Sequence, residues 1–188
     1  MNMLQEYFDY EKAKETLLYI ANRLHGKDND TYHVVKAIYF ADKLQLTEHG
    51  HTICGDDHVA MDFGPVPSTV YDILKTVRGK SIAFRDDPEL PEILTTFDNG
   101  TKYEGFRPLR NADLDFFSKS NIRNLDTAID MVKGKSFQEL VDMTHSERAW
   151  QMAWEKAEQH GSRSELIDRR ELLMSLPEGE EMLEYMEA

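Results

Sequence analysis

Apolar residues near the start of the chain recur at the three- and four-residue spacing of an amphipathic helix. One such stripe occupies residues 13–24, and Gly26 just after it is expected to stop the helix. A second stripe occupies residues 34–46, and Asp30 or Thr31 ahead of it can cap its first turn. The pattern therefore predicts two consecutive helices in the first quarter of the chain.

The stretch after the second helix switches from a helical to an extended pattern and back. Residues 59–63 predict a strand, and a Gly-Pro-Val-Pro sequence at residues 64–67 follows directly. Each proline fixes its own φ and keeps the residue before it out of the helical conformation. We therefore expect a rigid corner here, with Pro67 as the first residue of a helix that ends near Gly79.

The middle of the chain is less regular. Residues 81–99 contain two prolines and an acidic cluster, and we expect them to form a surface loop that can include one short helical turn. Residues 101–109 can form a short edge strand, which we expect to pair with residues 52–63. The predicted fold class is mainly α with a small antiparallel β-sheet, an α+β fold in one compact helical domain.

Capping signals predict the helices of the second half. Asn111 is expected to cap a long helix, with acidic residues in its first turn. Residues 136–139 and 144–147 each have the pattern of a capping box, in which two side chains satisfy free helix N–H groups. Trp150 and Trp154 then lie one turn apart, and we expect both to pack in the core.

The last part of the chain differs in composition. Residues 161–164 have the pattern of a linker, so we expect one domain over residues 1–160. Residues 161–188 are expected to form an acidic, helical C-terminal extension, packed on that domain or tethered to it. Because the segment after Pro177 is rich in glutamate and carries no basic residue, it can also serve as a flexible arm for a partner.

Composition narrows the functional classes. The 188 residues carry a formal net charge of −13 and no basic stripe, which disfavours direct binding of nucleic acid and favours a basic partner. No apolar run approaches the ~20 residues of a membrane helix. Residues 1–10 lack the features of a secretory leader, and Cys54 is the single cysteine, so we expect a reducing cytoplasm.

Candidate chemistry gathers around the second helix. Asp42 lies on its apolar stripe, so its carboxylate needs hydrogen-bond donors, which residues 50–55 or the strand can supply. Zinc-type ligands crowd into the next ten residues, namely His49, His51, Cys54 and His58, although their spacing is not that of a known site. A metal site, a Cys54 nucleophile with a histidine base, and an inert loop all remain open.

Nucleotide-binding, metalloprotease and serine-hydrolase motifs are absent from the sequence. We therefore predict no catalytic residues, no metal and no cofactor, and the chain is expected not to be an enzyme.

Two groups of residues resemble the motifs of the Panacea domain, the SocA-like antitoxin family. The first group is Asp42, Gly50, Gly55, Ala60-Met61 and Gly64-Pro65-Val66-Pro67-Ser68. The second is Leu140, then Thr144-His145, then Trp150. This chain has Val141 where the family often has a serine, which argues against a hydroxyl role at that position. The spacing within both groups makes the resemblance specific.

The resemblance implies an antitoxin that binds and neutralises a toxin encoded beside it. An adaptor that delivers the toxin to a Clp-type protease is the first alternative. A DNA-binding regulator and a metal-dependent hydrolase are further alternatives with less support in the residues. Assembly with further copies of the same chain stays open.

Partner contacts are expected on the irregular surface around the Gly-Pro-Val-Pro segment, because recognition concentrates on loops held by a rigid scaffold. The expected residues are Asp42, Gly50, His51, Asp56, Asp57, Met61, Asp62, Phe63, Gly64, Pro65 and Pro67. Thr144, His145 and Trp150 are expected to have structural roles. The acidic segment after Pro177 is the competing location for the partner.

Overall fold

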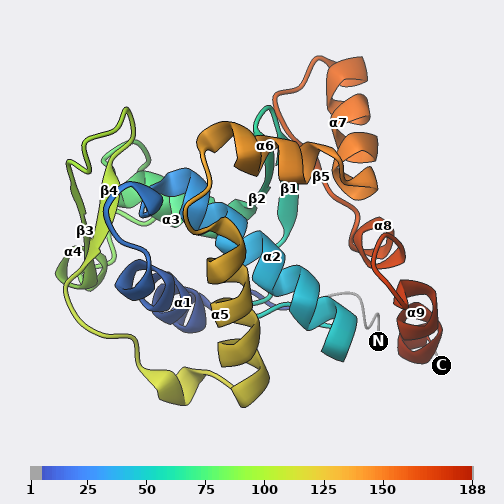
Figure 1. The fold of residues 1–188 in the computed structure, drawn as a ribbon, viewed down its shortest axis with the longest axis horizontal. Helices are drawn as coiled ribbons and strands as arrows, with labels where there is room; N and C mark the ends of the chain where they lie inside the picture. Colours follow the sequence, from blue (N-terminus) through green and yellow to red (C-terminus); the bar gives the residue numbers. More distant parts are fainter. Residues whose placement is uncertain (1–5, 188) are drawn as a thin grey trace.

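The computed structural model describes residues 6–187 and omits the side chain of Glu187. The first five residues, part of the segment expected to lack a secretory leader, therefore lie outside the described range. Helix α2 (Thr31–His49) runs through the middle of the molecule (Figure 1). As predicted, Asp30 caps it by accepting a hydrogen bond from the His33 amide. The helix continues one turn beyond its expected end, to Gly50 in the left-handed conformation.

Four further helices surround α2 and supply most of the core. They are α1 (Tyr10–Arg23), α3 (Ser68–Val77), α5 (Lys119–Val132) and α6 (Phe137–His145), and each packs against α2. The α1 stripe is buried as expected, but the helix ends at Arg23 with Leu24 as its C-cap, and Gly26 starts the short 3₁₀ turn η1 (Gly26–Asp28) instead. Because α2 is covered on several sides, most of its residues are buried.

The Gly-Pro-Val-Pro segment is a strand, which corrects the prediction of a simple corner. Strand β2 (Gly64–Pro67) pairs antiparallel with β1 (His58–Met61), and β1 pairs on its other side with β5 (Glu165–Leu166). The sheet order β2-β1-β5 leaves β2 at an edge, where strand prolines are tolerated. Pro67 is the residue before α3 rather than its first residue.

A second, separate sheet corrects the predicted strand pairing. Strand β4 (Gly105–Pro108) pairs with β3 (Leu94–Phe97), not with residues 52–63. The segment expected to be a surface loop contains one short helix, α4 (Leu90–Ile93), as allowed for, but it also contributes β3, which was not expected. The physical reason is burial, because the apolar side chains of Leu90, Ile93 and Leu94 all enter the core.

The capping predictions are partly confirmed. Ser136 and Glu139 form the expected capping box of α6. Asn111 does not cap a long helix, because the 3₁₀ turn η2 (Leu114–Phe116) comes first and Ser118 caps α5. The second predicted box does not form either. Thr144 lies inside α6, and Glu147 precedes α7 (Arg148–His160) without a capping hydrogen bond.

The carboxylate of Glu147 is turned to other partners, since it accepts hydrogen bonds from Tyr39 and Lys43 on α2. These contacts explain why the local capping pattern of residues 144–147 fails.

The C-terminal segment packs into the same core. After β5 come α8 (Arg169–Met174) and α9 (Gly179–Glu187), both at the right of Figure 1. Buried side chains of the two helices and of the link between them include Leu172, Leu173, Leu176, Leu183 and Met186. The architecture confirms the predicted fold class, mainly helical with small antiparallel sheets.

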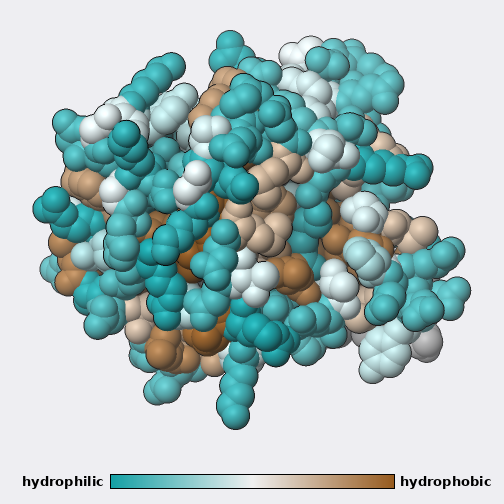
Figure 2. All heavy atoms as spheres, viewed as in Figure 1, coloured by the Kyte–Doolittle hydropathy of each residue, from teal (hydrophilic) through white to brown (hydrophobic). Residues whose placement is uncertain are grey.

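Hydrophilic residues cover most of the face shown in Figure 2, and apolar atoms emerge there only in separate patches. Among residues 6–187, no helix combines the length and apolar character needed to cross a lipid bilayer.

Candidate functional site

The β1–β2 hairpin carries part of the first family-like motif, with Ala60-Met61 before its tip and the Gly-Pro-Val-Pro segment after it. Met61 faces Gly64 across the strands, and Asp62 and Phe63 form the turn between them. The Phe63 side chain is 47% exposed. Gly64 has φ +98°, and a Cβ there would collide with the Thr144 hydroxyl and the Lys36 ammonium. Only glycine therefore lets the hairpin approach α2 and α6 this closely.

A buried lysine on α2 lies beneath the hairpin. The Lys36 side chain is 1% exposed, and its ammonium donates a 2.9 Å hydrogen bond to the Pro65 carbonyl. No carboxylate in residues 6–187 forms an ion pair with it. Burial lowers the pKa of Lys36 to about 7, although the more distant charge of Glu147 opposes this shift. This buried cation has no signal in the sequence, where Lys36 is one polar residue in a helix.

The second motif supports the hairpin from the other side. The Trp150 indole donates a 3.1 Å hydrogen bond to the Met61 carbonyl, and its ring stacks on His145 with centroids 3.9 Å apart. Thr144 is buried and donates to the Leu140 carbonyl. Burial lowers the pKa of His145, and the positive charge of Lys36 lowers it further. Two motifs about eighty residues apart thus meet at one hairpin, and the expected structural roles have a physical basis.

Asp42 and His58 form a closed pair inside the protein. Asp42 accepts a 2.8 Å hydrogen bond from the Ile53 amide, which lies in the link expected to supply it. Its other oxygen lies 3.1 Å from His58 Nε2. Neither of these two facing atoms has another hydrogen-bond partner in the described part of the chain. Because both side chains are buried, with Asp42 0% exposed, the pair cannot reach an external substrate or partner.

Asp56 organises the start of α3. Its two carboxylate oxygens accept hydrogen bonds from the Thr69 and Val70 amides at 3.0 and 2.8 Å. The helix needs this cap because Pro67, the residue before its first turn, has no side-chain hydrogen-bonding group. Burial raises the pKa of the Asp56 carboxyl, and the two amide hydrogen bonds oppose that shift.

The expected partner-binding residues therefore divide into two sets. Six are buried and act by shaping the surface, namely Asp42, Gly50, Asp56, Gly64, Pro65 and Pro67. Five have exposed or half-buried side chains, namely His51, Asp57, Met61, Asp62 and Phe63. The structure brings Met61, Asp62 and Phe63 together at the hairpin tip, while Asp57 lies at the other end of β1.

The zinc-type residues do not converge. His58 pairs with Asp42, whereas His49 and His51 are exposed and stack with ring centroids 6.0 Å apart. Cys54 is buried, and burial raises the pKa of its thiol well above the ordinary value. Within residues 6–187, no three His, Cys, Asp or Glu side chains are arranged to hold a metal ion.

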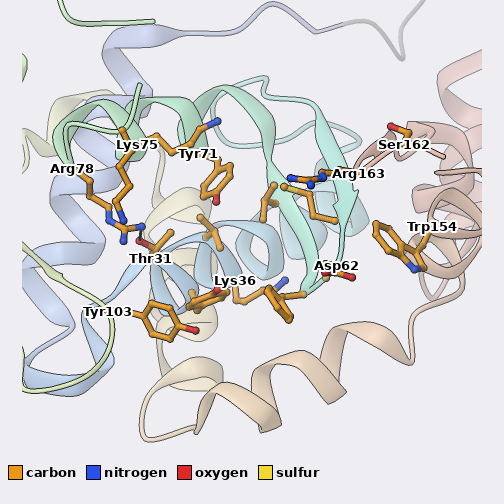
Figure 3. Close-up of a pocket in the computed structure, with 17 residues that line it drawn as sticks. Thr31, Lys36, Asp62, Tyr71, Lys75, Arg78, Tyr103, Trp154, Ser162 and Arg163 are labelled. Carbon is orange, nitrogen blue, oxygen red and sulfur yellow. Dashed lines mark hydrogen bonds between the residues drawn. The ribbon is translucent and has the colours of Figure 1, made fainter. Parts of the chain in front are cut away.

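A pocket of about 690 Å³ opens beside the hairpin. Its walls come from α2, the hairpin, α3, the loop between β3 and β4, and α7 with the segment after it (Figure 3). Five cationic side chains line it, Lys36, Lys75, Arg78, Lys80 and Arg163, against the single carboxylate of Asp62. Sequence reasoning missed this site, because its cations are spread over about 130 residues of an acidic chain.

These features define a helix-rich α+β protein built around a short Gly-Pro-Val-Pro hairpin, which a second helical motif supports. A comparison with protein families matches residues 34–151 to the family described as antitoxin SocA-like, Panacea domain. The chain belongs to this family, which supports an antitoxin role in general. Comparisons with curated proteins and with solved structures each found no match.

Proposed function

We propose that this protein is an antitoxin that neutralises a protein toxin by direct binding and without catalysis. The observation that carries the proposal is the hairpin tip, where Asp62 and Phe63 are exposed between Met61 and Gly64, inside the region that matches an antitoxin family. Buried contacts from Lys36 and Trp150 hold this tip in place. A rigid tip loses little conformational entropy on binding, so an exposed aromatic side chain there suits a protein interface.

We define the hairpin surface as Met61, Asp62 and Phe63 at the tip, together with Asp57 at the opposite end of β1. Its two carboxylates belong to a protein of net charge −13, which favours a basic toxin. The acidic segment after Pro177 is the competing location. Instead of a free arm it contains α9, which buries Leu183 and Met186 in the core. We therefore favour the hairpin surface.

The test is co-expression with the toxin encoded in the neighbouring gene, followed by affinity purification. Phe63→Ala should weaken the complex at least about tenfold, as expected for an aromatic anchor. The matched control is Phe116→Ala, because Phe116 is 39% exposed but lies in η2. Equal toxin binding by both variants would contradict the role of the hairpin. Rescue with no complex, accompanied by toxin loss that requires a Clp-type protease, would instead identify an adaptor.

Charge is tested with a double reversal, Asp57→Lys with Asp62→Lys. Asp56 is unsuitable because it caps α3, so its replacement would disturb folding. The companion variant ends after Leu176 and lacks α9. If the folded double variant binds toxin normally while the truncated chain does not, the toxin docks on α9 and not on the hairpin surface.

A further inference from the structure

The side chains that line the pocket beside the hairpin carry a net positive charge, whereas the protein as a whole is negatively charged. Five of its lining side chains are cationic and one is acidic, in a chain whose formal net charge is −13. A cleft lined by one sign of charge concentrates ligands of the opposite sign. Lys75 and Arg78 have acidic neighbours, Asp72 and Glu104, but the lining keeps an excess of positive charge, which points to an anionic ligand.

The cations lie at both ends of the pocket. Figure 3 shows Thr31, Lys75 and Arg78 at one end, Ser162 and Arg163 at the other, and Lys36 between them. The Arg78 guanidinium donates a 3.1 Å hydrogen bond to the Thr31 hydroxyl and lies 3.4 Å from Glu104. These contacts orient a planar group that suits phosphate oxygens.

Lys36 supplies a second, independent observation. Lys36 is one of the residues that line the pocket, its side chain is nearly inaccessible to solvent, and its ammonium has one acceptor, the Pro65 carbonyl. The nearest acidic candidate, Glu147, is already held by Tyr39 and by Lys43 at 2.6 Å. A buried ammonium without a counter-ion is costly. An anion in the pocket would provide the missing partner.

Aromatic rings form much of the remaining wall. Tyr32, Tyr71, Tyr103 and Trp154 line the pocket, and Tyr32 meets Tyr103 edge to face at 4.7 Å. The volume of about 690 Å³ falls within the ~300–1,000 Å³ typical of small-molecule sites. Aromatic faces beside cations are the features that bind a nucleobase together with its phosphates.

We propose that this pocket binds a nucleotide, with its phosphates contacting Lys36 and Arg78 and its base packed against the aromatic wall. The pocket shares residues of the segment from Met61 to Val66 with the hairpin, and Met61, Asp62 and Phe63 of that segment also belong to the hairpin surface. A bound nucleotide would contact that segment and thereby link the pocket to the surface proposed to bind the toxin.

Isothermal titration calorimetry of the full chain tests this site with ADP, GDP, CDP and UDP at low ionic strength. At least one diphosphate should bind saturably, and at least tenfold more tightly than its own nucleoside or inorganic phosphate. Arg78→Ala and Lys36→Met should each weaken that binding tenfold or more. Arg85→Ala is the control, because Arg85 is an exposed cation outside this pocket.

Three results would overturn the proposal. The first is that none of the diphosphates binds saturably. The second is that inorganic phosphate binds as tightly as the nucleotides. The third is that Arg78→Ala and Lys36→Met both bind nucleotide as tightly as the parent chain. Circular dichroism and thermal melting of each variant establish that it is folded. Because no toxin is present, failure here leaves the antitoxin proposal standing, and the toxin experiments do not depend on nucleotide.

Discussion

Lys36 shows how a single residue can oppose folding while it shapes a site. Its charge is buried against the Pro65 carbonyl with no carboxylate paired to it in residues 6–187. The lowered pKa expresses the free energy that the protonated form loses on burial. An apolar side chain of similar length would avoid this loss. The presence of a lysine at position 36, beside the pocket, is thus easier to explain by ligand binding than by a contribution to stability.

We predict that Lys36→Met stabilises the protein by on the order of 1–3 kcal/mol near neutral pH. Removal of the buried charge is stabilising, since each pKa unit corresponds to about 1.4 kcal/mol. Loss of the hydrogen bond to Pro65 offsets part of that gain. The folded pKa is about 7 and the ordinary value 10.5. Between these values the unfolded chain binds more protons, so stability should rise with pH in the parent chain.

Urea unfolding from pH 7 to 9.5 measures the effect as the difference between parent and variant. That difference should shrink as pH rises. Lys75→Met is the control, because Lys75 lies on the surface of α3 beside Asp72. A variant less stable than the parent at pH 7 would show that the buried ammonium is a net stabilising contact.

At the scale of elements, the β1–β2 hairpin depends on close approach. Helices α2 and α6 both contact its edge strand β2. At Gly64, the side chains of Lys36 and Thr144 are so close that no Cβ atom fits. The Trp150 hydrogen bond to the Met61 carbonyl fixes the opposite strand. The hairpin is therefore positioned by tertiary contacts as well as by its prolines.

We expect Gly64→Ala to reduce the free energy of unfolding by roughly 2–4 kcal/mol, because a positive φ and a steric clash add together. Gly79→Ala is a matched control, since Gly79 also has a positive φ, +67°, but nothing lies within 4 Å of an added Cβ. That variant should lose only ~1 kcal/mol. Equal losses, measured by urea unfolding, would mean that the clash relaxes without cost.

At the scale of the whole molecule, the C-terminal segment completes the main sheet and the core. β5 covers the edge of β1, and the Ile167 amide donates to the His58 carbonyl at 2.8 Å. Leu172 and Leu173 of α8 are buried against the rest of the core. The family match ends at residue 151, so β5 and α8 lie beyond the matched region while the strand that β5 covers lies inside it.

Truncation after His160 should therefore be far more damaging than truncation after Leu176. The first removes β5, α8 and α9, which exposes a strand edge and apolar core residues, and such surfaces promote aggregation. The second removes α9 alone. We expect the shorter chain to be insoluble or molten and the longer one to remain folded with a lower melting temperature. Similar melting and size-exclusion profiles would show that β5 and α8 contribute little.

Much of the fold could be predicted from neighbouring residues, because helix periodicity and caps are local signals. The α2 helix with its Asp30 cap, the Ser136 capping box and a strand near residues 59–63 all follow from such patterns. The fixed spacing within the two motifs is likewise a property of the sequence, and it is enough to indicate the family. These features need no knowledge of which distant segments touch.

Only the tertiary structure decided the strand partners and the site. β3 pairs with β4, and β5 joins β1, because long-range burial outweighs weak local preferences. Packing also places the buried Asp56 carboxylate at the start of α3, where it accepts hydrogen bonds from two free amides. The pocket cations come from three separate segments, and their shared position is a property of packing. Their proximity, and the lowered pKa of Lys36, depend on distances that no local pattern encodes.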